Sequence, residues 1–151
     1  NNQKTTLWSA ALDNTEVKKY PDRELNHYIE FNSDQLDQTA KQYGVSREDM
    51  LKQYDLDDED EFNAVNEDSS KLRVKQEMLI QYIADKENLS YTDKEKEALI
   101  KSFEAQGYDA DAIEQQTGRT LEDYVHIELL YEKVLDFLLD NANITGAPTT
   151  E

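Results

Sequence analysis

The sequence predicts an all-α fold, and three observations support this prediction. The chain of 151 residues contains only four glycines and two prolines, so long helices can continue without interruption. Apolar residues recur at the three- and four-residue spacing of a helix face. No stretch of useful length alternates apolar and polar residues as a strand does. The pattern therefore indicates helices packed on helices.

Two helices are expected before residue 44. Residues 5–14 form a short helix, and residues 14–22 form a connector in which Pro21 suits the first turn of the next helix. Residues 22–43 form a long helix that Gly44 ends as a left-handed cap. The apolar stripe of this helix is expected to contain Leu25, Tyr28, Ile29, Leu36, Ala40 and Tyr43.

The next two helices are short and then long. Ser46 is expected to cap a short helix over residues 46–55, with Asp49 three positions later as its partner. A long helix follows from about residue 59 to residue 88, and its acidic start suits the helix dipole. The polar residues 66–70 are expected to be its weakest part.

The last three helices also begin at capping residues. The sequence TDKE is a full capping box that opens a helix over residues 92–106, which Gly107 ends. Asp109 caps a short helix that ends before Gly118. Thr120 opens the last helix, which continues to about residue 142. A single domain is predicted over residues 1–144, with residues 1–21 as its opening helix and connector and residues 145–151 as a tail.

One turn occurs twice in the chain. Residues 41–51 and residues 104–114 repeat the same order at an offset of 63 residues. In each, a helix ends at a glycine, an apolar residue follows, and a capping Ser or Asp opens a short helix. The simpler interpretation is that both stretches are a common way of joining two helices by a turn. The other interpretation is two similar arms in one architecture.

Composition excludes several classes of function. The net charge is −18, so the chain lacks the cationic face that binds nucleic acid, and an anionic bilayer would repel it. There are no cysteines, which excludes disulfides and thiol catalysis. No apolar run is long enough for membrane insertion. Because the chain begins at Asn1 and not at Met, we expect a piece of a longer protein.

The candidate metal and catalytic motifs fail on inspection. A calcium loop starting at Asp55 would need glycine at Asp60 and glutamate at Asn66. The triplet that starts at His126 resembles a zinc-deaminase motif but lacks the cysteine pair that this chemistry needs. His27 is the only other histidine, and no glycine-rich phosphate loop is present. We therefore predict no enzyme, no metal and no cofactor, with both histidines structural or on the surface.

Two segments are apolar over more of their circumference than one packing partner needs. In residues 120–142 the apolar residues span an arc of roughly 200°, whereas a helix packed on one neighbour needs about 100°. Residues 72–84 are similarly broad. Most of these side chains are expected to be core. The others are expected to line open grooves that bind apolar surfaces.

Two stretches of the sequence resemble a known family. They are KLRVKQEMLIQYIADKENLSYTDKE and LLYEKVLDFLLDNANI, and LWSAALDNTEVKKYPDRELNHYIEF shows a looser similarity. Their order, spacing and residue types resemble the C-terminal domain of trigger factor, the bacterial folding chaperone. The similarity covers most of the chain. It implies an elongated multi-helix body with two arm-like helical hairpins, similar to the periplasmic chaperone SurA.

The resemblance implies an ATP-independent holdase that binds unfolded or nascent polypeptides at shallow apolar grooves. The family also has ribosome-binding and peptidyl-prolyl isomerase domains, but neither is recognisable here. We expect any such domain to lie N-terminal to Asn1 in a longer parent. Classical members of the family are cytoplasmic, and we expect the same location for this chain. Some Gram-positive relatives resemble exported lipoproteins, so an exported, lipid-anchored protein is the alternative.

Five residues are predicted to contact clients because they lie on the two short arm-like elements. They are Tyr54, Leu56, Phe62, Tyr108 and Ile113. The protein is expected to be a monomer or a weak homodimer. The alternative function is a helical scaffold or dimerisation module, in which the apolar arc of residues 120–142 serves one fixed partner.

Overall fold

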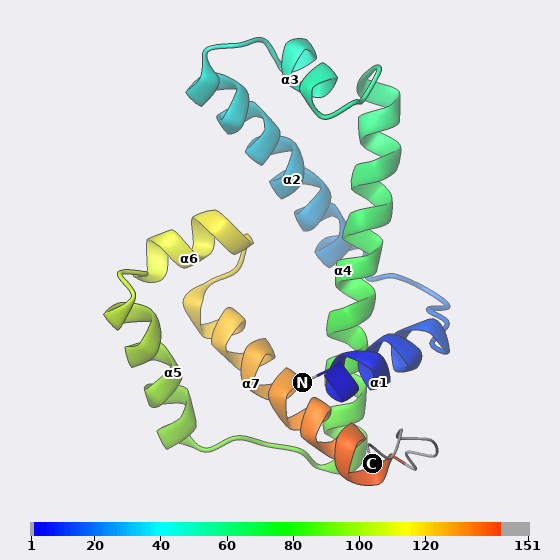
Figure 1. The fold of residues 1–151 in the computed structure, drawn as a ribbon, viewed down its shortest axis with the longest axis vertical. Coiled ribbons are helices and arrows are strands. Elements are labelled where there is room, and N and C mark those ends of the chain that lie inside the picture. The colour runs from blue at the N-terminus through cyan, green and yellow to red at the C-terminus, as the bar shows by residue number, and fades with distance from the viewer. Residues whose placement is uncertain (1, 143–151) are drawn as a thin grey trace, which may run out of the picture. The chain divides into compact units, whose positions relative to one another are not determined.

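A computed structural model of the chain describes residues 2–142 (Figure 1). Within these residues all regular structure is helical, which confirms the all-α prediction. None of the helices in this range is long and apolar enough to cross a membrane. The predicted tail lies outside the described residues. The helices are α1 (Asn2–Asp13), α2 (Asp22–Tyr43), α3 (Arg47–Gln53), α4 (Glu59–Glu87), α5 (Asp93–Ala105), α6 (Ala110–Thr117) and α7 (Leu121–Asn141).

The predicted caps at Gly44, Ser46 and Thr92 are confirmed, because capping is local chemistry, whereas the first helix begins at Asn2 and not at residue 5. Gly44 ends α2 with φ 67°, in the left-handed region that glycine adopts easily. The Ser46 hydroxyl accepts the amide N–H of Asp49 at the start of α3. Both hydrogen bonds of the capping box between Thr92 and Glu95 are present at the start of α5.

The chain divides into two compact units, and the division falls inside α4. Unit 1 comprises residues up to 16 and from 78 onward, and unit 2 comprises residues 17–77. Unit 1 therefore contains α1, the end of α4, and α5 to α7. Unit 2 contains α2, α3 and most of α4. The single domain over residues 1–144 stays a prediction.

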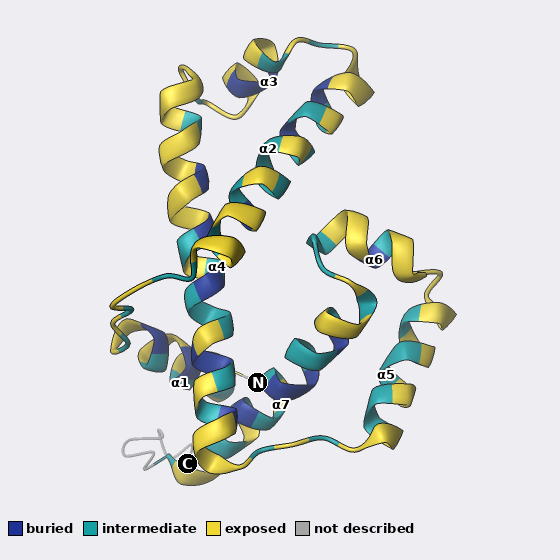
Figure 2. Cartoon of the chain, turned by 180° about the vertical axis from the view of Figure 1, so that it is seen from behind, coloured by how far each residue is buried: buried dark blue, intermediate teal, exposed yellow. Residues whose placement is uncertain are grey.

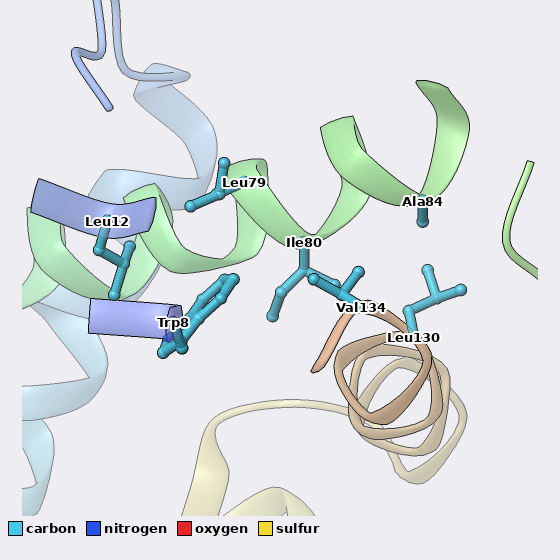
Figure 3. Close-up of a cluster of buried hydrophobic side chains, with 7 residues drawn as sticks. All are labelled: Trp8, Leu12, Leu79, Ile80, Ala84, Leu130 and Val134. Carbon is cyan, nitrogen blue, oxygen red and sulfur yellow. The ribbon is translucent and has the colours of Figure 1, made fainter. Parts of the chain in front are cut away.

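Unit 1 is built around α7, which explains the wide apolar arc of that helix. Three helices, α1, α5 and α6, pack on α7, and the end of α4 joins its core. The indole of Trp8 meets the ring of Tyr131 edge to face at 5.1 Å between centroids. The arc thus faces several neighbours within one unit. The core side chains are Trp8, Leu12, Leu79, Ile80, Ala84, Leu130 and Val134 (Figure 3).

Unit 2 has a small apolar cluster where α3 packs on α2. Its buried members are Leu36, Ala40, Met50 and Leu51. Farther along, α2 and α4 meet through polar side chains. Asn66 donates to the carbonyl of Ile29 at 2.9 Å and accepts from Asn32 at 2.8 Å.

The polar segment at residues 66–70 is not a weak point of α4. The helix is continuous there, and Asn66 and Ser70 are 3% and 1% exposed. Asn32 of α2 donates to both side chains. Asn66 and Ser70, which are poor helix formers by themselves, therefore form the buried contact between α4 and α2. Each of these polar side chains has a hydrogen-bond partner there.

Some apolar residues of the predicted stripes are exposed (Figure 2). Tyr43 was expected on the buried face of α2 but is 69% exposed, since it is the last residue of the helix and the chain turns at Gly44. In residues 72–84, Leu72 is 51% exposed and Tyr82 is 60% exposed. Helical spacing alone therefore overestimates what is buried.

The two hairpins α2–α3–α4 and α5–α6–α7 correspond around their turns at the offset of 63 residues, although α2 and α4, with 22 and 29 residues, are longer than α5 and α7, with 13 and 21. Adding 63 to the first residue of α3 gives the first residue of α6, and the starts of α4 and α7 agree within one residue. The short helices even end alike, since Asp55 has φ 58° and Gly118 has φ 70°. This agreement favours two similar hairpins over a generic turn.

Candidate functional site

Each hairpin ends in a short helix, and these two ends hold the predicted client-binding residues. We call residues 44–62 the α3 tip, and residues 107–125, at the offset of 63, the α6 tip. The α3 tip belongs to unit 2 and the α6 tip to unit 1.

The α3 tip combines an exposed tyrosine with half-buried apolar residues. Tyr54 caps the C-terminus of α3 and is 55% exposed. Leu56 and Phe62 are half-buried and pack against the cluster of Met50 and its neighbours. Tyr54, Leu56 and Phe62 therefore all keep some accessible apolar surface, as a shallow binding site requires.

The short helix of the α6 tip has one buried residue, whereas α3 has two. Tyr108 is 38% exposed, and the half-buried rings of Phe103 and Tyr124 lie 5.7 Å apart at its base. No residue of α5 is fully buried. Ile113 is a correction to the sequence prediction, because it is 4% exposed and belongs to the interior of the tip. The sequence placed it on a short exposed helix, but α6 packs on α7 and Ile113 is its buried residue.

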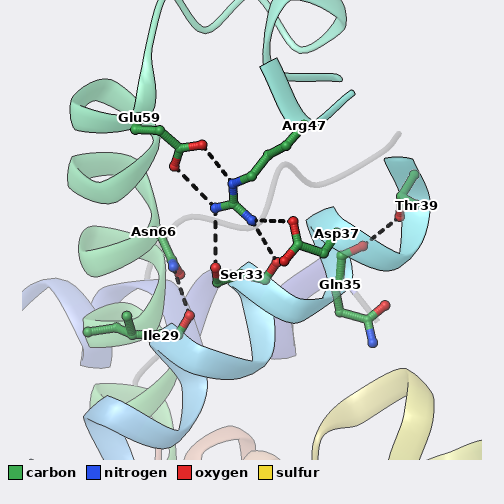
Figure 4. Close-up of polar contacts among 8 residues, drawn as sticks. All are labelled: Ile29, Ser33, Gln35, Asp37, Thr39, Arg47, Glu59 and Asn66. Atoms are coloured by element: carbon green, nitrogen blue, oxygen red, sulfur yellow. Dashed lines mark hydrogen bonds and ion pairs between the residues drawn. The ribbon is translucent and has the colours of Figure 1, made fainter. Parts of the chain in front are cut away.

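A single cation, Arg47, connects the α3 tip to α2 and α4 (Figure 4). The guanidinium of Arg47, the first residue of α3, donates to both carboxylate oxygens of Glu59 on α4 at 2.7 and 3.2 Å. It also donates to Asp37 on α2 at 2.8 Å, and to the carbonyl and hydroxyl of Ser33 at 3.1 and 3.2 Å. It lies 5.0 Å over the ring of Phe62. The bidentate bond to Glu59, with Asp37, raises the pKa of Arg47, so its charge is permanent.

The α6 tip lacks this arrangement. Ala110 occupies the position that corresponds to Arg47. The positions that correspond to Ser33 and Glu59 are Lys96 and Glu122, and these two form a direct ion pair of 2.8 Å between α5 and α7. The two outer helices are thus joined in both hairpins, but only in unit 2 does the joining cation come from the short helix.

An open pocket of about 420 Å³ lies beside α3 and is mostly acidic. Leu51 is the apolar side chain in its lining. The carboxylates would repel acidic segments. The full lining is Glu48, Leu51, Asp57, Asp58, Glu59 and Asp60.

A second charged contact in unit 1 has a neutral counterpart in unit 2. Lys133 of α7 donates to Glu95 of α5 at 2.5 Å. This bond, with those from the amide and hydroxyl of Thr92, lowers the pKa of Glu95 to about 2. At the corresponding positions of unit 2, Asn32 donates to Ser70 at 3.2 Å. The same contact is therefore charged in one hairpin and neutral in the other.

Both histidines contact neighbouring side chains. His126 accepts from or donates to the hydroxyl of Tyr91 at 2.8 Å, and its other ring nitrogen lies 3.4 Å from Gln81. His27 contacts the ring of Tyr28. In residues 2–142 no group of three or more His, Cys, Asp or Glu side chains could hold a metal ion.

The structure also exposes apolar residues that the sequence analysis did not select. Besides the two predicted tyrosines these are Tyr43, Val65, Leu72, Met78 and Tyr82. Tyr43 directly precedes the α3 tip, so it extends the accessible apolar surface there. The signal that could have found it is its position immediately before a helix-ending glycine.

The family model for the C-terminus of the bacterial trigger factor protein matches residues 1–140. The chain belongs to this trigger factor family. The match includes both hairpins and α1, so both tips are part of the trigger factor C-terminal domain. The alternative of a scaffold for one fixed partner is not favoured.

Curated relatives agree with the trigger factor assignment. The chain is 28% identical to the trigger factor of Staphylococcus saprophyticus over 148 residues, which is 95% of this chain and 32% of that protein. It is 31% identical to the trigger factor of Bacillus licheniformis over 108 residues, which is 71% of this chain and 25% of that protein. The chain thus spans about a third or less of the length of these relatives. No solved structure gives a significant match.

Proposed function

We propose that this chain is an ATP-independent chaperone domain, a holdase that binds unfolded or nascent polypeptides at the α3 tip and the α6 tip. The observation that carries the proposal is that each tip presents an exposed tyrosine beside half-buried apolar side chains. Membership of the trigger factor family supports it. The client-contacting residues in this proposal are Tyr54, Leu56, Phe62 and Tyr108.

Two weak sites on one chain suit a holdase. Each tip offers little apolar surface, so each contact releases quickly, while binding at both raises the overall affinity. The net charge of −18 keeps the loaded protein soluble and disfavours acidic clients. We propose that the protein works as a monomer or weak homodimer in the bacterial cytoplasm, which the family resemblance implies.

The test is the aggregation of several unrelated, chemically unfolded clients, followed by light scattering without ATP. We expect the chain to suppress aggregation at several-fold excess. Tyr54→Ser and Tyr108→Ser should each weaken suppression, and the double variant should lose most of it, with unchanged helix content. Tyr82→Ser is the matched control, because Tyr82 is 60% exposed but lies on α4 outside both tips.

Two outcomes would contradict the proposal. Absence of suppression by the unmodified chain would reject the holdase function. Equal loss in the Tyr82→Ser control would reject the location at the tips. Sedimentation distinguishes the rival scaffold function, because a dedicated partner surface predicts a stable dimer or one stoichiometric complex.

A further inference from the structure

The short helix α3 is held in place almost entirely by contacts with its neighbours. It has seven residues, far fewer than an isolated helix needs to be stable in water. Residues with left-handed backbone stand on both sides of it, Gly44 with φ 67° and Asp55 with φ 58°. A segment bounded by two such sharp turns can move as a body when its side-chain contacts are lost.

Beneath α3 lies a small apolar cluster that α3 shares with α2, and Val45, Leu56 and Phe62 pack against it. Met50 and Leu51 are each 2% exposed and pack on Leu36 and Ala40 of α2. Two adjacent apolar side chains on a short helix are what an unfolded client segment would also present. The helix α3 therefore occupies a site on α2 that also fits an apolar segment of a client.

Arg47 is the polar contact that fixes α3 over this surface. Its guanidinium reaches Ser33 and Asp37 on α2 and Glu59 on α4, so α3 cannot lift unless these bonds break. The other cation of α3, Lys52, pairs only within the helix, with Glu48 at 2.7 Å. Removal of Arg47 therefore breaks contacts between α3 and its neighbouring helices, whereas removal of Lys52 breaks a contact within α3.

We propose that Arg47 is a latch that controls how much apolar surface the α3 tip offers to clients. With the latch closed, α3 covers Leu36 and Ala40. With the latch open, α3 lifts, and an apolar segment of an unfolded polypeptide takes the place of Met50 and Leu51. This inference rests on the proposed holdase function. It assigns no such latch to the α6 tip, because Ala110 stands at the position that corresponds to Arg47.

The experiment compares Arg47→Met with the matched control Lys52→Met, which removes the same charge from the same helix. Hydrogen exchange of the α3 amides measures opening directly, without any client. Because bonds to charged groups are among the strongest in proteins, we expect exchange in α3 to accelerate roughly tenfold or more in Arg47→Met. The amides of α7 report whether unit 1 is still folded and should not change. Lys52→Met should leave the exchange rates in α3 near those of the unmodified chain.

The same two variants are then titrated with an unfolded client. Arg47→Met is expected to bind several-fold more tightly and Lys52→Met unchanged. Equal α3 exchange in the two variants would overturn the latch, and so would faster exchange with no gain in client affinity. If Arg47→Met unfolds α2 as well, Arg47→Lys replaces it, since lysine keeps the charge but has three donors and cannot reproduce the five hydrogen bonds of the Arg47 guanidinium. A chain that binds no client at all rejects the holdase proposal, while the exchange data still test the latch.

Discussion

The α3 tip and the α6 tip share a backbone and differ in what holds them. Both have a glycine at the end of the preceding helix, a side-chain cap and a left-handed residue after the short helix. In the α3 tip, Arg47 connects the short helix to both long helices. In the α6 tip, Ala110 stands at the position of Arg47, and Lys96 and Glu122 join the long helices directly. The two hairpin ends thus share their capping chemistry but differ at the position that Arg47 occupies in one and Ala110 in the other.

The largest expected effect tests the difference in packing between the tips. Met50→Ala removes a residue that is 2% exposed inside a four-residue cluster, and we expect a loss of about 3–4 kcal/mol in the free energy of unfolding of unit 2. Ile113→Ala, at the corresponding position, should cost unit 1 about 2 kcal/mol, because α6 has one buried residue where α3 has two. Denaturant unfolding monitored by hydrogen exchange in each unit measures both. A larger cost for Ile113→Ala would reverse the comparison.

A smaller effect follows from the charged contact that only unit 1 has. Because the pKa of Glu95 is lowered from 4.5 to about 2, its ionised form stabilises the fold above pH 4.5. That stabilisation is lost as the pH falls from 4.5 towards 2. Lys133→Met removes the main cause, so the acid-induced loss of unit 1 stability should become shallower than in the unmodified chain.

The control for this pH experiment is Lys101→Met, which removes an exposed lysine of α5. It should leave the acid dependence unchanged. A Lys133→Met variant with the same pH profile as the unmodified chain would show that Glu95 takes its low pKa from Thr92 alone.

The smallest expected effect concerns Glu128, whose counterpart in unit 2 is the exposed Val65. Burial raises the pKa of Glu128, and the charge of Glu132 raises it further. The ionised form is therefore disfavoured in the folded state, so stability is gained as the pH falls through the raised pKa. Glu128→Gln should slightly raise the melting temperature at neutral pH, and this gain should shrink in acid.

Exposed Glu104 provides the control for that substitution. Glu104→Gln removes the same charge without a burial effect and should change the melting temperature less. An equal rise in both variants would mean that the gain comes from the reduced net charge and not from burial of Glu128.

Local sequence signals predicted the helices well because they depend on neighbouring residues. The Ser46 and Thr92 caps and the Gly44 turn lie where the sequence placed them. The site was predicted less completely. Tyr54 and Tyr108 are accessible as expected, but Ile113 is interior and Tyr43 is exposed. Burial depends on which distant element covers a side chain, and periodicity carries no information about that.

The sequence by itself determined the all-α class, the helix ends and the resemblance to the trigger factor family, since capping, turns and amphipathic spacing are properties of a few adjacent residues. Only the tertiary structure decided the role of Arg47, which the sequence shows as one exposed-looking cation at the start of a short helix. Its partners Ser33, Asp37 and Glu59 lie 10 to 14 residues away along the chain and on two other helices. They meet because α2 and α4 are joined through Asn32 and the buried Asn66, and no local pattern encodes that contact.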